Sequence, residues 1–143
     1  MIKNRKAYFN YHVLDKIEAG IVLTGTEAKS ARLGKIDISN AFCLISEQLE
    51  VELHQLKITP YAYGNIFNHD SKRIRKLLLH KNEIRKLSRT LKSTGLALIP
   101  LALYFKRGNL KVLLGVCKGK KIQDKEKLRK ARDLAHAKAE QDY

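Results

Sequence analysis

Cysteine is scarce in this sequence, and so are acidic residues. Only two of the 143 residues are cysteines, Cys43 and Cys117, and they lie far apart in apolar runs without a Cys-x-x-Cys pair. This arrangement argues against a metal site or a redox pair and favours two buried thiols in a reducing compartment. A chain of this length can bury roughly 70% of its unfolded surface, so it needs no disulfide or metal to hold a core.

Long hydrophobic runs are also missing. No segment approaches the roughly 18 continuous apolar residues that a membrane-spanning helix needs. Residues 1–4, Met-Ile-Lys-Asn, have neither the apolar core of a signal peptide nor a lipidation pattern. We therefore expect a soluble, cytoplasmic protein that does not bind a membrane.

Motifs for catalysis are sparse. The sequence has no nucleophile elbow, no Gly-rich phosphate loop and no zinc motif, and four of its histidines show no metal-ligand spacing: His12, His54, His80 and His136. His69 beside Asp70 could act as a general acid or base, because a carboxylate can orient an imidazole. Adjacent side chains rarely face each other, however, and Asn68-His69-Asp70 is more typical of a turn. We expect no catalytic activity, no cofactor and no metal.

Basic residues, in contrast, are abundant. The 29 Lys and Arg against 14 Asp and Glu give a formal net charge of +15 and a pI near 9.9, which makes nucleic acid the leading class of partner. Nine of the basic residues lie between Lys72 and Lys92, with Glu83 as the one acid. Arg73, Arg75 and Lys76 surround one isoleucine just before an apolar run, so we expect an ordered segment that contacts phosphates. Such a charge also favours a monomer when the protein is free.

The apolar pattern is mainly that of β-strands. Strands are predicted over residues 8–14, 17–23, 42–46, 49–58, 96–105 and 110–117, with the alternation slipping by one near Gln55, which suggests a bulge. Residues 106–109 have the composition of a hairpin turn, and Pro100 favours a sheet edge or a bulge. This spacing predicts a mainly β fold: a small antiparallel barrel of the oligonucleotide-binding type.

Two helices flank the predicted barrel. Thr24-Gly25-Thr26-Glu27 is a capping box, and Gly34 should end the helix that follows it. A second helix is predicted over residues 81–94, before Gly95. Its apolar stripe faces the barrel and its cations lie on a different face: Ile84, Leu87 and Leu91 against Lys81, Arg85, Arg89 and Lys92.

The composition changes after residue 117. Residues 118–143 carry nine Lys or Arg and five acids, with few large apolar side chains. Helix propensity is high there while tertiary anchoring is weak, so we predict a tail that is disordered when free and helical on a partner. The chain then divides into a nucleic-acid-binding barrel, residues 1–117, and a basic tail, residues 118–143.

Two features leave alternatives open. Glu18 works against electrostatic affinity in so basic a protein, and it could either accept hydrogen bonds from a base edge or form a salt bridge with a neighbouring lysine. Tyr61 and Tyr63 could stack on bases or pack in the core, whereas Phe9 is better placed in the core.

Five blocks occur in a characteristic order: Glu18-Ala19-Gly20, Thr26-Glu27-Ala28-Lys29-Ser30-Ala31-Arg32, the basic segment of residues 72–79, Gly119-Lys120-Lys121 and Asp124-Lys125. With them the chain, from about residue 4 to 125, resembles the SmpB or SsrA-binding protein family. The resemblance implies an oligonucleotide-binding-like barrel with flanking helices that binds the tRNA-like domain of transfer-messenger RNA (tmRNA) and carries it to stalled ribosomes. In that family the protein stands where the anticodon stem of a tRNA would be.

The resemblance also implies sites. The RNA-contact positions of the family match Asn4, Glu18 and Leu78, and the full set of expected RNA-binding residues is Asn4, Arg5, Lys6, Glu18, Lys29, Arg32, Arg73, Arg75, Lys76 and Leu78. The blocks associated with the decoding site and the message channel of the ribosome match Gly119, Lys120, Lys121, Asp124 and Lys125. Glu126 and Ser71 depart from the Arg and Pro that the family commonly has there. A general ribosomal or cold-shock-like binder of structured RNA is the alternative function.

Overall fold

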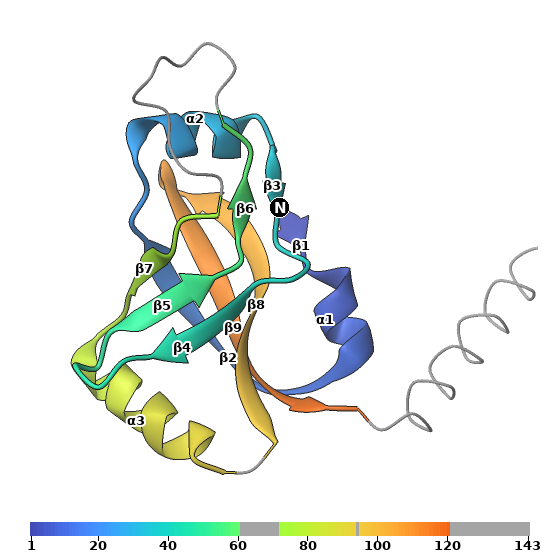
Figure 1. Ribbon diagram of the computed structural model, residues 1–143, viewed down its shortest axis with the longest axis vertical. Helices are drawn as coiled ribbons and strands as arrows, with labels where there is room; N and C mark the ends of the chain where they lie inside the picture. The colour runs from blue at the N-terminus through green and yellow to red at the C-terminus, as the bar shows by residue number, and fades with distance from the viewer. Residues whose placement is uncertain (61–71, 94, 121–143) are drawn as a thin grey trace, which may run out of the picture.

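Nine strands and three helices make up the part of the chain that the computed structural model describes, residues 1–60, 72–93 and 95–120 (Figure 1). In chain order they are β1 (Ile2–Lys3), α1 (Arg5–Asn10), β2 (Tyr11–Ile21), α2 (Gly25–Arg32), β3 (Ile36–Asp37), β4 (Phe42–Ile45), β5 (Val51–His54), β6 (Lys57–Ile58), β7 (Arg75–Leu78), α3 (Lys81–Leu91), β8 (Leu96–Lys106) and β9 (Asn109–Gly119).

Six of the strands pair in a closed ring. The order along the main sheet is β1-β8-β4-β5-β7-β2-β9, and β8 pairs with β9 as well, so that the sheet returns to its second strand. All of these pairs are antiparallel. Closing the sheet removes the exposed edges that an open sheet would present. The predicted mainly β, antiparallel fold class is confirmed, and the described residues add a third helix, α1, to the two predicted ones.

Three strands of eleven residues each, β2, β8 and β9, form one wall of the ring. The β8–β9 register shifts between Pro100 and Ala102, which agrees with the bulge, one of the two alternatives predicted for Pro100. The hairpin between these strands turns through Arg107 and Gly108, with φ of 53° and 79°. Positive φ at both central residues is the geometry of a two-residue turn whose twist matches the flanking strands.

The beginning of the chain differs from the prediction. Residues 8–10, predicted as strand, belong to α1, and β2 is one continuous strand where the sequence predicted two. Asn4 explains why a helix begins here, because its side chain accepts a hydrogen bond from the backbone N–H of Ala7 at 3.1 Å and so caps α1. Ala7 is buried in a small cluster with Ile99 and Leu101, which packs α1 against β8.

The predicted slip near Gln55 also has a different form. Gln55, the residue after β5, has φ of 60°, and the chain then continues into β6, which pairs with β3 in a separate two-stranded sheet. The alternation of apolar residues therefore slips because one strand ends and another begins, and not because of a bulge within one strand. At the other end of the barrel domain, β9 continues to Gly119, two residues past the predicted boundary at residue 117.

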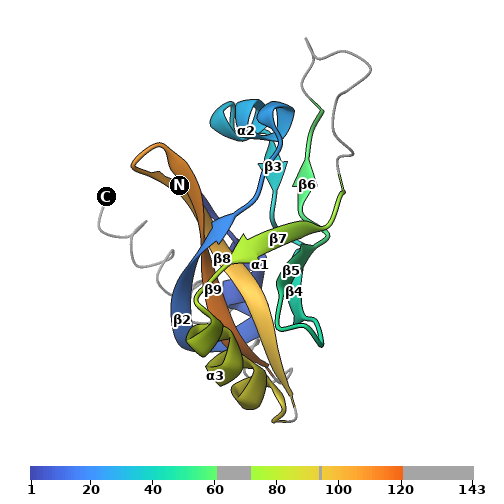
Figure 2. The same ribbon diagram turned by 90° about the vertical axis from the view of Figure 1, so that its left-hand side faces the viewer.

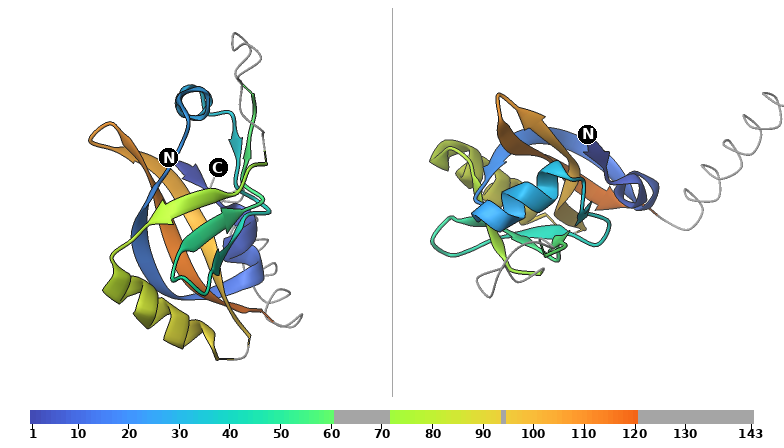
Figure 3. Two further views of the ribbon diagram at one scale, coloured as in Figure 1. Left: turned by 60° about the vertical axis from the view of Figure 1, so that its left-hand side comes forward. Right: turned by 90° about the horizontal axis from the view of Figure 1, so that it is seen from above.

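Both predicted helices are present. Thr24 and Glu27 form the predicted capping box of α2, and Gly34 has φ of 73° just beyond its end. Ile84 and Leu87 of α3 are buried against the barrel. Figures 1 and 2 show α2 and α3 at opposite ends of the molecule, and the view from above in Figure 3 shows α2 lying over one end of the strands.

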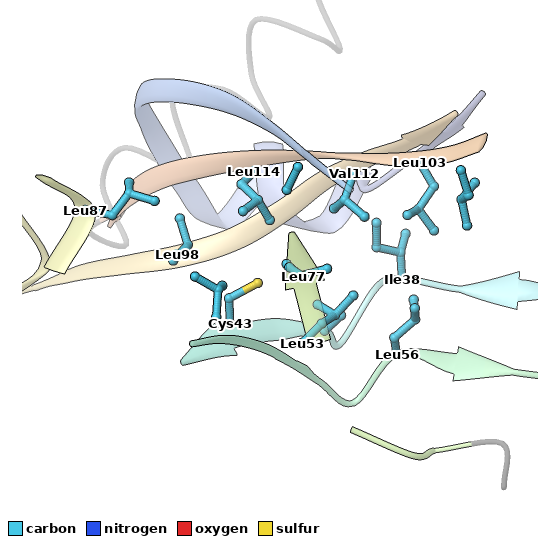
Figure 4. Packing of buried hydrophobic residues seen from close by; sticks show 14 of the residues in the cluster. Ile38, Cys43, Leu53, Leu56, Leu77, Leu87, Leu98, Leu103, Val112 and Leu114 are labelled. Atoms are coloured by element: carbon cyan, nitrogen blue, oxygen red, sulfur yellow. The ribbon is translucent and has the colours of Figure 1, made fainter. Parts of the chain in front are cut away.

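The core lies inside the ring of strands (Figure 4). Side chains from opposite walls meet there, among them Leu53, Leu77, Leu98, Val112 and Leu114, which are all at most 2% exposed. Both cysteines are buried as predicted. Burial raises the pKa of the Cys117 thiol to about 11, and it raises that of Cys43 as well.

Candidate nucleic-acid interface

The outer surface where β2 pairs with β7 brings Glu18, Gly20 and Leu78 together. Gly20 and Leu78 are register partners across the two strands. In β7 the inward positions belong to Arg75 and Leu77, so alternation turns Leu78 outward, where it is 54% exposed. A Cβ atom on Gly20 would lie 3.3 Å from the Leu78 Cβ, so the missing side chain leaves room for the leucine to cover the strand.

Glu18 is an oriented carboxylate on the same surface. It accepts a hydrogen bond from the Tyr104 hydroxyl, and Lys106 Nζ lies 3.5 Å from its other oxygen. The Tyr104 hydrogen bond is the main cause that lowers the pKa of Glu18, and Lys106 and Lys111 lower it further. Burial and the bond to Glu18 raise the pKa of Tyr104 to about 12. Glu18 is thus ionised at neutral pH, and its free lone pairs can accept further hydrogen bonds.

Two cations flank this surface. Lys76 points outward from β7, and its Nζ lies 3.1 Å from Glu50, in an ion pair with both side chains about half exposed. Arg73 donates a hydrogen bond to the carboxylate of Glu27 and a longer one, 3.4 Å, to the carbonyl of Val22. Its side chain remains 38% exposed. Both residues therefore place cations along the pair of strands that carries Leu78.

The prediction that Arg75 binds RNA needs a correction, because Arg75 has no exposed surface. Its Nε donates to Glu27 Oε2 at 2.7 Å, and its Nη1 donates to the carbonyl of Leu56. Burial alone would raise the pKa of Glu27, but the hydrogen bonds from Arg73, the Thr24 backbone and Arg75 outweigh it and lower the pKa. The predicted direct contact between Arg75 and RNA is therefore wrong for this fold. Arg75 instead connects β7 to α2 through Glu27.

Asn4 requires the same correction. It is 2% exposed, and besides capping α1 its amide donates to the carbonyls of Pro100 at 2.9 Å and Ile38 at 3.3 Å. Asn4 thus fixes the start of α1 and offers no surface to RNA. Its neighbours Arg5 and Lys6 are exposed on α1, and Lys6 Nζ donates to Asn40 Oδ1 at 2.9 Å.

The remaining predicted residues are spread over other elements. Lys29 and Arg32 are exposed on α2, whose Glu27 binds Arg73. Arg5 and Lys6 lie on α1, which packs against β8 through the buried Ala7. The structure therefore gathers four of the ten predicted RNA-binding residues into one surface: Glu18, Arg73, Lys76 and Leu78.

The predicted tail residues divide in two. Gly119 ends β9, and Lys120 is held to α1, with its backbone N–H donating to Asn10 O at 2.9 Å and its Nζ donating to Tyr8 O at 3.0 Å. Both therefore belong to the fold rather than to a separate tail. Lys121, Asp124 and Lys125 lie outside the described residues, as do the His69-Asp70 pair and the two tyrosines Tyr61 and Tyr63.

Comparison with known proteins decides the family. The family model for the SmpB protein matches residues 1–142. The chain is 51% identical over 133 residues to an SsrA-binding protein of Carboxydothermus hydrogenoformans, covering 93% of this chain and 89% of that protein. It is 52% identical over 132 residues to the SsrA-binding protein of Treponema denticola, covering 92% and 85%. The chain belongs to the SmpB family.

A solved structure agrees with this membership. One of its chains, described under "tmRNA-SmpB: a journey to the center of the bacterial ribosome", matches with a TM-score of 0.71 and 48% sequence identity, over 85% of both chains. The resemblance found in the sequence is thereby confirmed, together with the SmpB fold that it implied.

Tyr104 and Lys106 were missed by the sequence prediction. The signal was present, since both are polar residues at alternating positions in an otherwise apolar strand, and the predicted hairpin sets their strand beside β9. Among the described residues no group of His, Cys, Asp or Glu is arranged to hold a metal ion. None of the helices in the described ranges is both long and apolar enough to cross a membrane.

Proposed function

We propose that this chain is a non-catalytic RNA-binding adaptor of trans-translation. It binds the tRNA-like domain of tmRNA, delivers it to stalled ribosomes in the cytoplasm, and stands in for the anticodon stem that this RNA domain lacks. Membership of the SmpB family and a net charge of +15 support this function.

The surface of Glu18, Gly20 and Leu78 is the observation that carries the proposal. Phosphates repel a carboxylate, so the lone pairs of Glu18 that Tyr104 and Lys106 leave free favour N–H donors on exposed base edges over the phosphate backbone. The exposed Leu78 adds an apolar contact that salt does not screen. Such a surface suits the unstacked bases of a folded RNA loop better than a regular duplex, which presents phosphates and 2′-hydroxyls and keeps its bases stacked.

The other candidate residues take supporting roles. Arg73 and Lys76 supply phosphate contacts beside Leu78, and four further exposed cations extend the attraction to other parts of the RNA: Arg5, Lys6, Lys29 and Arg32. Glu27 and Arg75 hold β7 in place beneath the surface.

In this proposal, the residues after Lys120 bind the ribosome. Lys121, Asp124 and Lys125 follow directly on Lys120, which is fastened to α1, so the proposed ribosome-binding segment leaves the barrel from a fixed point. Deleting all residues after Lys120 should preserve binding to the RNA while abolishing peptide tagging on stalled ribosomes. Loss of both activities would contradict a separate tail function.

Binding measurements at several salt concentrations test the RNA-binding role. The probes are a tRNA-like RNA with an intact elbow and an RNA duplex of equal length. Wild-type protein should prefer the elbow at physiological salt, and Leu78→Ala should reduce this preference without changing the salt dependence, because it removes no cation. Leu44→Ala is the matched control, since Leu44 is 51% exposed on β4, which pairs with β5 and β8 and with neither β7 nor β2.

A general binder of structured RNA is the second candidate, and the large net charge favours it. That function predicts equal affinity of the wild-type protein for the elbow RNA and the duplex. It also predicts no difference between the two leucine variants.

A further inference from the structure

Helix α3 presents a row of cations on the side away from its buried stripe. The exposed basic residues are Lys81, Arg85, Lys86 and Arg89 of the helix and Lys92, which caps its C-terminal end. The one acid of the helix, Glu83, is occupied at the N-terminus, where its carboxylate accepts a hydrogen bond from the His80 backbone at 3.1 Å. No ion pair in the described residues involves any of the five cations. The charge of this row is therefore available to a partner.

Two of these arginines line a hollow. Arg85, Ser88 and Arg89 surround a depression of about 310 Å³ together with Leu49, from the turn between β4 and β5. Residues three and four apart lie on one side of a helix, so both guanidinium groups and the hydroxyl face the same space. No carboxylate lines it. Arg85 has one weak contact, 3.5 Å to Asn82 Oδ1, which leaves most of its donors free.

This set of groups fits phosphate. A guanidinium offers a planar fork of N–H donors that matches two oxygens of a phosphate, and neighbouring forks can bind successive phosphates of a backbone. We propose that Arg85 and Arg89, assisted by Ser88, bind backbone phosphates of the same RNA molecule that contacts Leu78. This inference rests on the proposed function and adds a second contact region to it.

The hollow beside α3 lies close to the Leu78 surface, which favours the same RNA molecule as its ligand. Helix α3 begins three residues after Leu78, and the Lys76–Glu50 ion pair joins β7 to the residue next to Leu49. In Figure 2, the paired strands β2 and β7 and helix α3 lie on the side that faces the viewer. An RNA lying on Leu78 can therefore continue over Lys76 to the hollow beside α3.

A pair of double variants tests the inference. Arg85→Gln with Arg89→Gln removes two positive charges at the hollow. Lys35→Gln with Lys57→Gln is the matched control, because it removes the same charge from exposed side chains after α2 and on β6. All four side chains are exposed, so neither double variant should disturb the fold. Affinity for the tRNA-like RNA is measured from low to physiological salt, and binding to purified ribosomes is measured in parallel.

The α3 variant should lower the slope of log K against log salt by about 1.4 to 1.8, since each of the two lost phosphate contacts removes about 0.7 to 0.9. Its affinity for the RNA should fall about tenfold or more, and the control should change far less. Equal effects of both variants overturn the inference, and so does an α3 defect confined to ribosomes. If the wild-type protein shows no preference for the elbow but the slope still falls, the proposed function fails while the phosphate contact stands.

Discussion

Removing the buried carboxylate of Glu27 should strongly destabilise the fold. Glu27 and Arg75 are both 0% exposed, and they are linked by a hydrogen bond of 2.7 Å. Glu27→Ala leaves the Arg75 guanidinium buried without its counter-ion, which costs about 3–5 kcal/mol. It also removes the hydrogen bond from the Thr24 backbone, worth about 0.5–1.5 kcal/mol. A domain of this kind has only about 5–15 kcal/mol in total.

Urea unfolding followed by circular dichroism measures this loss, because small domains usually unfold in one cooperative step. The double variant Glu27→Leu with Arg75→Met supplies the control. Replacing both members of a buried pair by apolar side chains is often neutral, so the double variant should regain most of the stability that Glu27→Ala loses. A loss below about 1 kcal/mol for Glu27→Ala, or a double variant as unstable as the two single changes combined, would refute the structural role of the pair.

The pair also gives the protein a defined response to acid. The pKa of Glu27 is lower in the folded protein than its ordinary value of 4.5. Its contribution to stability is therefore complete above pH 4.5 and is lost as the pH falls through the folded pKa. Wild-type protein should lose stability below pH 4.5 more steeply than Glu27→Gln, which has no proton to bind at that position. Parallel curves for the two proteins would contradict the lowered pKa.

Two further substitutions test the packing and the proposed site. Gly115→Ala should cost about 1–3 kcal/mol in urea unfolding, because the new Cβ would lie 2.6 Å from a methyl group of the fully buried Leu101; an unchanged midpoint would contradict the tight contact. Tyr104→Phe should raise the pKa of Glu18 and weaken the preference for the elbow RNA, since it removes the hydrogen bond that orients the carboxylate. Carboxyl NMR titration and RNA binding check both effects, and a variant that keeps the wild-type pKa and preference would remove Tyr104 from the site.

Much of the fold could be predicted because several local signals were strong. The capping box at Thr24 and Glu27 satisfies backbone donors through side chains that are adjacent in sequence. The hairpin at Arg107 and Gly108 depends on two residues alone. The helix α1 was missed because its start depends on Asn4, whose amide is held by the carbonyls of strand β8 and of Ile38, far away in the sequence.

The candidate site shows a similar division. Glu18 and Leu78 could be selected from the family resemblance, and both are exposed on one surface. Arg75 could not be separated from Arg73 and Lys76, because a run of cations carries no sign of which one is buried. Its burial depends on Glu27, 48 residues away, and only the folded structure brings the two together. Charge density thus located the surface, while tertiary contacts decided which cations are free.

NMR of the leucine methyl groups tests the central claim most directly: that non-ionic contacts between β2 and β7 recognise the tRNA-like RNA. The tRNA-like RNA is titrated into wild-type protein at physiological salt, and the methyl signals of Leu78 and Leu44 are followed. We predict that the methyl chemical shifts of Leu78 change in proportion to the bound fraction, while those of Leu44 do not change. Saturation of the protein with RNA while the Leu78 methyl signals stay unchanged would contradict the account.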